Sequence, residues 1–246
     1  MAARLTSTLA TFGSAIALIA VSATPTLALA PTSLAAAGAA ATVGTQASPA
    51  PQARAGSATA VVSNTRSSGA GSLRAALVAA NKRSKTTATT ITFATAGTIV
   101  LTSNLTPIKR RVIINATTAP GYVSGGAPVV GLNANGKDAF RFDAGSAGSQ
   151  LLGIAVTRAR GNGVTLNAGG ITVNYNQIGL TVAGNAAGNR GSGIYIARAS
   201  KKNKIGMNPS KASGAVGNVI SANRGAGIRI SGSSANVIQA NRIGTN

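Results

Sequence analysis

Only two side-chain carboxylates are available for acid–base chemistry in this sequence, Asp138 and Asp143, and histidine and cysteine are absent. Most glycosidases hold two carboxyl groups about 5 to 9 Å apart across the bond that they cleave. The spacing of these aspartates places them on opposite faces of a strand unless a turn intervenes. If Phe140 and Phe142 face the core, Arg141 and Asp143 are neighbours on the outer face. We therefore predict a weakly stabilising Arg–Asp surface pair and assign no catalytic residue.

The same scarcity of ligands argues against a metal site. Hard cations take several oxygen ligands, usually from more than one carboxylate, and zinc sites use thiolates or imidazoles. The glycine-rich phrases lack a Lys-Ser or Lys-Thr pair at the spacing of a phosphate-binding loop, and we expect no helix after them. The sequence therefore predicts neither a metal nor a cofactor.

A phrase of Gly-x-Gly followed by an apolar, any and an apolar residue occurs three times. A turn that leads into a short alternating strand, when repeated, is typical of a coiled β solenoid. If these strands stack in register, Thr165, Tyr195 and Arg229 form one exterior column. Such a column could hold a sugar and its carboxylate, and an ordinary solvent-facing column is the alternative. The copies are Gly161–Leu166, Gly191–Ile196 and Gly225–Ile230, with Val164, Leu166, Ile194, Ile196, Ile228 and Ile230 facing inward.

Two basic segments follow predicted strands. One contains Arg158 and Arg160, and the other contains Lys201, Lys202 and Lys204. We predict that both lie in turns, where they could form a rim that binds phosphate or uronate. Charge that is simply solvated in turns is the alternative.

The chain carries 23 Lys and Arg residues and a formal net charge of +21. Such an excess favours polyanionic partners, although positive charge also limits self-association of a repetitive surface. Only 3% of the residues are aromatic, and the aromatic platforms of nucleic-acid-binding modules are missing. An anionic polysaccharide or cell-envelope polymer is the expected partner, and no nucleic acid is expected.

The first part of the chain has the features of an exported protein. Residues 1–30 resemble a signal peptide, with an apolar centre at Ala15–Val21 and a small-x-small cleavage sequence at Ala28–Ala30. A later cleavage site and an uncleaved membrane anchor are the alternatives. Residues 31–57 have the composition of a disordered linker. We expect a mature chain without a transmembrane segment, secreted or held at the cell surface.

The folded domain is expected over residues 58–246 and begins with one helix. Ser72 is a suitable N-cap, and Leu73, Ala76, Leu77 and Ala80 recur with helical spacing on one face. The helix should end near Asn81, so it covers about residues 72–81. A single amphipathic helix before a run of strands suits a cap on the end of a solenoid.

Short strands bounded by Gly, Asn or Ser follow the helix. Their loops are too short for crossover helices, so the strands should stack as coils. Residues 225–246 resemble one complete coil with three strands. The strands expected before them include Thr90–Phe93, Thr98–Leu101, Val112–Ile114, Pro128–Leu132, Ala139–Phe142, Leu152–Val156, Val164–Leu166, Ile171–Tyr175 and Gln177–Leu180.

Several phrases, in order, resemble bacterial secreted right-handed parallel β-helix repeat proteins of the pectate-lyase-like superfamily. The similarity extends over roughly residues 60–246. The phrases are Val61–Asn64, Gly71–Asn81, Ile91–Phe93, Thr98–Leu101, Ala119–Tyr122, Gly217–Asn223 and Asn236–Thr245. The resemblance implies an all-β fold, a right-handed single-stranded parallel β-helix with an N-terminal capping helix. Enzymes of that superfamily cleave acidic polysaccharides with carboxylates, Ca²⁺-bound carboxylates and an outward arginine, and the carboxylate clusters have no counterpart here.

We therefore expect a non-catalytic extracellular or cell-envelope protein that binds anionic polysaccharide through a basic outer face. A polysaccharide lyase or hydrolase is the first alternative, with Arg229 or Arg198 as the base. A structural or assembly module that associates end to end, or a remnant of a longer β-helix protein, is the second. An open coil end would favour such stacking, since it presents unpaired backbone groups.

Overall fold

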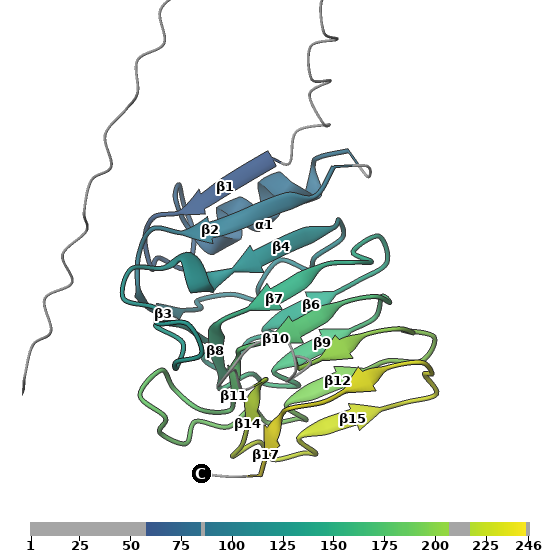
Figure 1. Ribbon diagram of the computed structural model, residues 1–246. Coiled ribbons are helices and arrows are strands. Elements are labelled where there is room, and N and C mark those ends of the chain that lie inside the picture. Colours follow the sequence, from purple (N-terminus) through teal and green to yellow (C-terminus); the bar gives the residue numbers. More distant parts are fainter. Residues whose placement is uncertain (1–57, 85–86, 207–216, 245–246) are drawn as a thin grey trace, which may run out of the picture. The chain divides into compact units, whose positions relative to one another are not determined.

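The computed structural model describes residues 58–84, 87–206 and 217–244. These residues belong to one compact unit that extends from Pro51 to Asn246. The proposed leader and linker, residues 1–57, lie outside the described residues. The fold of the described residues is predominantly β, with one α-helix and one short 3₁₀ helix, η1 (Ala116–Thr118) (Figure 1). No helix of this part is long and apolar enough to cross a membrane.

The strands form three sheets, which we call A, B and C, and neighbouring strands in each are parallel. Sheet A contains, in spatial order, β1 (Ala58–Val62), β2 (Thr89–Phe93), β4 (Val112–Asn115), β7 (Gln150–Leu152), β10 (Thr172–Asn174), β13 (Lys204–Ile205) and β16 (Val237–Ile238). Sheet B contains β3 (Gly97–Val100), β5 (Val130–Asn133), β8 (Ile154–Thr157), β11 (Gln177–Ile178), β14 (Val219–Ile220) and β17 (Arg242–Ile243). Sheet C contains β6 (Phe140–Phe142), β9 (Val164–Leu166), β12 (Ile194–Ile196) and β15 (Ile228–Ile230).

From β4 onward the chain visits sheets A, B and C in turn, and each round pairs with the round before it. Figure 1 shows the result, in which the strands of each sheet are stacked from the blue end of the domain to the yellow end. This order and the parallel pairing agree with the predicted parallel β-solenoid. The final coil contains the three expected strands, β15, β16 and β17.

Alternating burial along the strands creates the core. On sheet C, the first and last residues of β9 and of β12 are fully buried, whereas the middle residues, Thr165 and Tyr195, are partly exposed. Burial of each such aliphatic side chain contributes about 2 kcal/mol. Ile230 is in register with Ile196 but is 45% exposed. Ile230 therefore has the predicted alignment with the inward residues of the other coils, but it is not buried, because the described residues place no further coil over it.

The predicted strand Leu152–Val156 is two strands that belong to different sheets. Residues before Gly153 form β7 in sheet A, and residues after it form β8 in sheet B. Gly153 has φ +71°, and a Cβ there would collide with Thr117. Glycine therefore allows the chain to turn a corner within a continuous apolar run.

The helix α1 (Leu73–Asn81) has the predicted bounds and orientation. The Ser72 side chain accepts a hydrogen bond from the backbone N–H of Ala75 at 3.2 Å, as an N-cap does. The buried residues are those of the expected face, Leu73, Ala76, Leu77 and Ala80. The helix lies with β1 and β2 at the blue end of the domain (Figure 1).

Buried asparagines connect successive coils at the corner between sheets A and B. Asn176 donates from its backbone N–H and its side-chain Nδ2 to Oδ1 of Asn218, at 3.1 and 2.9 Å. Asn218 makes the same two bonds to Asn241, at 3.1 and 2.8 Å. Its Nδ2 also donates to the backbone oxygen of Val173 at 2.8 Å. Each amide thus satisfies groups that burial removes from water.

The other two corners carry equivalent pairs. Asn189 donates to Asn223 before the strands of sheet C, with Nδ2 to Oδ1 at 2.8 Å. Asn203 donates to Asn236 before the strands of sheet A, with Nδ2 to Oδ1 at 3.0 Å. The asparagine ladders therefore fix the register of the coils at all three corners.

Replacing Asn218 by alanine should lower the free energy of unfolding by on the order of 3 kcal/mol, because the backbone N–H and the Nδ2 group of Asn176 lose their shared acceptor, and Val173 and Asn241 each lose one of their donors. Chemical denaturation followed by circular dichroism measures this loss. The matched control is Asn185→Ala. Asn185 is exposed, and within the described residues only its backbone makes hydrogen bonds, so this change should alter stability little. Equal losses in the two variants would contradict the role of the ladder.

Candidate functional site

An outward column of four side chains runs across sheet C. Arg141 of β6 is in register with Thr165 of β9, Thr165 with Tyr195 of β12, and Tyr195 with Arg229 of β15. Both arginines are exposed, and Thr165 and Tyr195 are partly exposed. The structure therefore places Thr165, Tyr195 and Arg229 in the expected column. It adds Arg141, which the sequence places on the outer face but not in this column, because no Gly-x-Gly phrase precedes it.

Within this column, Arg229 stacks on Tyr195. The guanidinium carbon lies 5.7 Å from the centroid of the ring, which is within the range of a cation–π contact. Such a contact is worth about 0.5 to 1 kcal/mol at an exposed site. This contact holds the guanidinium beside the ring while the column stays open to solvent. A ligand could therefore meet the apolar ring of Tyr195 and the hydrogen-bond donors of Arg229 together.

The carboxylate of Asp143 is held by Arg141 and Asn167. Oδ2 accepts from Nε and Nη2 of Arg141 at 3.2 and 2.8 Å, and Oδ1 accepts from Nδ2 of Asn167 at 2.8 Å. The predicted Arg141–Asp143 pair is thus confirmed. Burial alone would raise the pKa of Asp143, but the two hydrogen-bond donors and the positive charges of Arg141 and Lys109 lower it overall.

The second carboxylate, Asp138, pairs with Arg160. Nε and Nη2 of Arg160 donate to the two carboxylate oxygens at 2.8 and 3.0 Å, in a bidentate arrangement. Both side chains are well exposed, so the pair contributes little to stability. Arg160 is therefore engaged by a carboxylate of its own chain. Each aspartate holds a different arginine, which does not resemble two carboxyl groups poised across a scissile bond.

A hollow of about 280 Å³ joins the Asp138–Arg160 pair to the column on sheet C. Its lining includes Asp138, Arg160, Arg141 and Thr165. The turn before β9 and the outer face of the sheet therefore form one continuous polar surface. Its acidic group is Asp138, which already accepts two hydrogen bonds from Arg160.

The predicted basic rim is divided between opposite ends of the sheet C strands. Arg158 and Arg160 precede β9, whereas Lys201 and Lys202 follow β12, the parallel neighbour of β9. Lys204 lies on β13 of sheet A and not in a turn. The two basic segments therefore lie at opposite ends of the sheet C strands, and a whole strand separates them.

Two further arginines, Arg190 and Arg224, were missed by the sequence search. Together with Arg158 they line a pocket of about 310 Å³. The sequence does hold a signal for them, because arginine directly precedes every Gly-x-Gly phrase, at Arg160, Arg190 and Arg224. The repeated unit is therefore Arg-Gly-x-Gly and not Gly-x-Gly alone.

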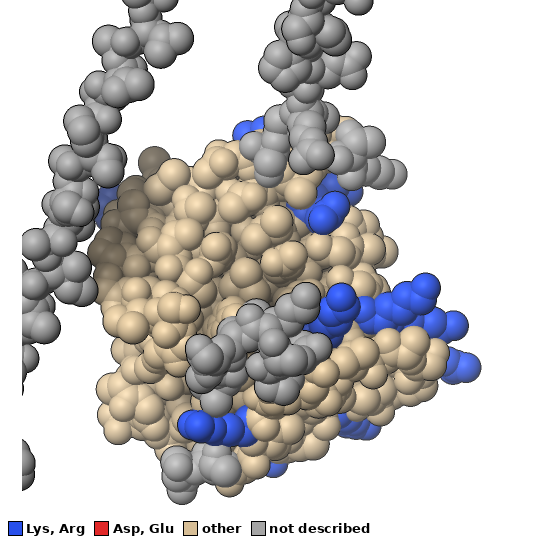
Figure 2. Space-filling view, in the orientation of Figure 1, with Lys and Arg blue, Asp and Glu red and all other residues tan. Residues whose placement is uncertain are grey.

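Basic side chains are visible at several places on the face drawn in Figure 2, and neither aspartate can be seen there. Both carboxylates pair with arginines at or close to sheet C. Most Lys and Arg residues of the described part therefore have no acidic partner. The molecule as a whole should attract polyanions at low salt, and less so as salt screens the charges.

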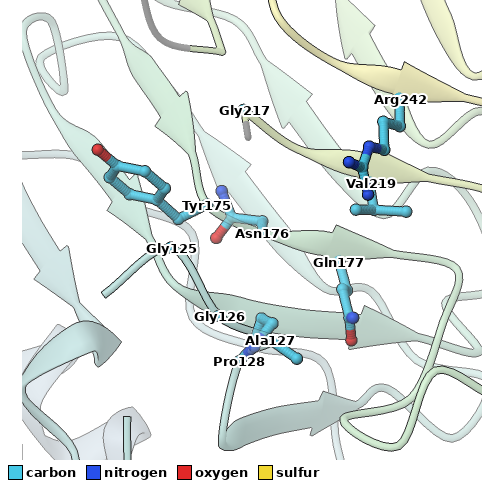
Figure 3. A pocket seen from close by; sticks show the side chains of 10 residues that line it. All are labelled: Gly125, Gly126, Ala127, Pro128, Tyr175, Asn176, Gln177, Gly217, Val219 and Arg242. Atoms are coloured by element: carbon cyan, nitrogen blue, oxygen red, sulfur yellow. The ribbon is translucent and has the colours of Figure 1, made fainter. Parts of the chain in front are cut away.

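A separate pocket lies over the outer face of sheet B (Figure 3). Gln177, Val219 and Arg242 lie side by side in register on its floor. Tyr175 and Arg242 lie at opposite sides of the hollow (Figure 3). Oε1 of Gln177 is buried and has no hydrogen-bond partner among the described residues. With one guanidinium and no carboxylate in its lining, this pocket offers binding groups and no acid–base pair.

The described residues contain no cluster of three His, Cys, Asp or Glu residues that could hold a metal ion. Comparisons with protein families, with curated proteins and with solved structures find no match to this chain. The fold is therefore assigned from the strand pairing itself. The arginine side chains of the sites described above are hydrogen-bond donors that can bind anions.

The lowered pKa of Asp143 can be tested in solution. Its contribution to stability should be present above the ordinary aspartate pKa of about 4 and lost as the pH falls through the lowered value. Replacing Asn167 by alanine should raise the pKa of Asp143, because one donor to the charged form is removed. A carboxyl-carbon NMR titration measures the shift, with Asn185→Ala as control. An unchanged pKa in Asn167→Ala would show that the donor does not matter.

Proposed function

We propose that this chain is a secreted or cell-surface β-helix protein that binds acidic polysaccharide without cleaving it, through the outer face of sheet C. The observation that carries the proposal is the in-register column of Arg141, Thr165, Tyr195 and Arg229. Neighbouring coils are about 4.8 Å apart, so ring, hydroxyl and guanidinium are within reach of one sugar unit. A guanidinium matches a carboxylate in a bidentate manner.

We further propose that the coils are right-handed, as in the pectate-lyase-like superfamily that the sequence resembles. Parallel strands joined by crossovers are right-handed in nearly all proteins, which supports this handedness. We assign α1 the role of a cap, since its apolar face is buried at the end of the domain that carries β1. Export rests on the signal-like residues 1–30.

The strongest competing function is a polysaccharide lyase that uses Arg198 or Arg229 as the base. Arg198 is exposed beyond the end of β12, and Arg229 stacks on Tyr195. Both aspartates are engaged by other arginines, which favours binding over cleavage. Incubation with polyuronate and Ca²⁺ separates the two functions, because a lyase generates an unsaturated product that absorbs ultraviolet light.

Replacing Tyr195 by alanine should weaken retention on an immobilised polyuronate column, because it removes the ring and the support of Arg229 without changing the net charge. We expect elution at clearly lower salt than for the unmodified chain. Tyr122→Ala is the matched control, since this partly exposed tyrosine lies outside sheet C. Equal retention of both variants and of the unmodified chain would count against a specific binding face.

A second function, assembly by end-to-end association with another copy, is favoured by the last coil. Ile230, Ile238 and Ile243 are 45%, 40% and 46% exposed. Their register partners Ile196, Ile205 and Ile220 are completely buried. Within the described residues, the coil of β15, β16 and β17 therefore presents core-like side chains to solvent, next to strand edges that can pair with another chain.

The double change Ile238→Lys and Ile243→Lys should abolish concentration-dependent association, because two charges would be buried in the contact. Multi-angle light scattering of the full chain over a wide concentration range measures this. Val78→Lys adds a charge on the exposed side of α1 and should leave association unchanged. An unmodified chain that stays monomeric at the highest concentration would rule out the assembly function.

A further inference from the structure

Three arginines that carry no other partner meet at one pocket, in the turns between sheets B and C. Arg158, Arg190 and Arg224 line a hollow of about 310 Å³, together with Asn135, Gly136 and Gly188. All three arginines are exposed. Their side chains make no hydrogen bond or ion pair within the described residues. A cavity that gathers three unpaired guanidinium groups is a binding site for negative charge.

The chain has no further side-chain carboxylate that could neutralise this pocket. Its two side-chain carboxylates, Asp138 and Asp143, hold Arg160 and Arg141. Three like charges at one hollow repel one another, and a bound anion would relieve that repulsion. The side chains of the described residues therefore leave this charge open to an external anion.

The backbone beneath the pocket is held in place by the buried ladder. Arg190 and Arg224 directly follow the ladder residues Asn189 and Asn223. Their backbone N–H groups donate to Ala159 and Asn189 at 2.9 and 3.0 Å. The two arginines therefore occupy equivalent positions on successive coils, about 4.8 Å apart.

The remaining wall is fixed as well. The backbone N–H of Arg158 donates to Ala187 at 3.1 Å, and its carbonyl accepts from Gly136 at 2.8 Å. Gly188 admits no side chain, because a Cβ would collide with the backbone oxygen of Ala222. Since this wall needs no ordering, binding would cost mainly the freedom of the three arginine side chains.

We propose that this pocket binds a phosphoryl group. A phosphomonoester carries a charge of about −1.5 to −2 at neutral pH and offers three acceptor oxygens, which suits three guanidinium donors. A single carboxylate has one charge and two oxygens, so it would leave donors and charge uncompensated. The site goes beyond the proposed polysaccharide face, because it involves neither Tyr195 nor Arg229.

The test uses the full chain and inorganic phosphate as the probe, at constant ionic strength and pH 7.5. Binding is followed by calorimetry and by the arginine Nε–H signals in NMR spectra. We expect saturable binding of phosphate, and weaker binding of acetate. Arg190→Gln and Arg224→Gln should each weaken phosphate binding by about tenfold, the size of one charge-assisted hydrogen bond. Arg66→Gln removes the same charge outside the pocket and should have little effect.

Each result either supports or overturns the proposed phosphoryl site. Non-saturable binding, or equal weakening in all three variants, would mean that phosphate responds to net charge only and would overturn the site. Acetate that binds as tightly as phosphate would overturn the assignment to a phosphoryl group. Circular dichroism confirms that the variants fold, and Arg190→Lys should restore part of the binding. Tyr195→Ala should bind phosphate normally, so failure of the polysaccharide function would leave this result unaffected.

Discussion

The burial of side-chain amides at the corners of the coils is the constraint on which the structure depends. An asparagine without partners in the core would be costly. Asn176 and Asn218 avoid that cost only if the next coil places an asparagine oxygen directly against them. A shift of one residue between coils would break these bonds and turn every inward side chain outward. The amides therefore specify the register, while the aliphatic core supplies most of the stabilisation.

An exact register inside the solenoid has a direct consequence outside it. Residues at equivalent positions on successive coils must stand next to each other, whether or not they attract. On sheet C this brings Arg229 over the ring of Tyr195. In the turns before sheet C it brings Arg190 and Arg224 together, and no carboxylate of the described residues pairs with them. Repulsion between such arginines is tolerated because the ladder beneath them holds the backbone.

The sequence predicts features that depend on local periodicity. The Ser72 cap, the buried face of α1 and the Thr165–Tyr195–Arg229 column follow from spacing within short segments. The sequence does not predict features that depend on contacts between distant segments of the chain. The corner at Gly153 lies in a continuous apolar run, and the crowding that excludes a side chain there comes from Thr117 in the preceding coil. The division of the basic rim likewise depends on which strand separates its two halves.

The placement of the two aspartates gives the basic surface a direction. Asp143 and Asp138 pair with Arg141 of β6 and with Arg160, which precedes β9. Tyr195, Arg229, Arg190 and Arg224 belong to the following coils and have no carboxylate beside them. On the outer face of sheet C, an anion should therefore meet less competition from the chain's own carboxylates at β12 and β15 than at β6. Within the described residues, the two carboxylates thus compensate arginines of the first coils of sheet C and leave those of the following coils without an acidic partner.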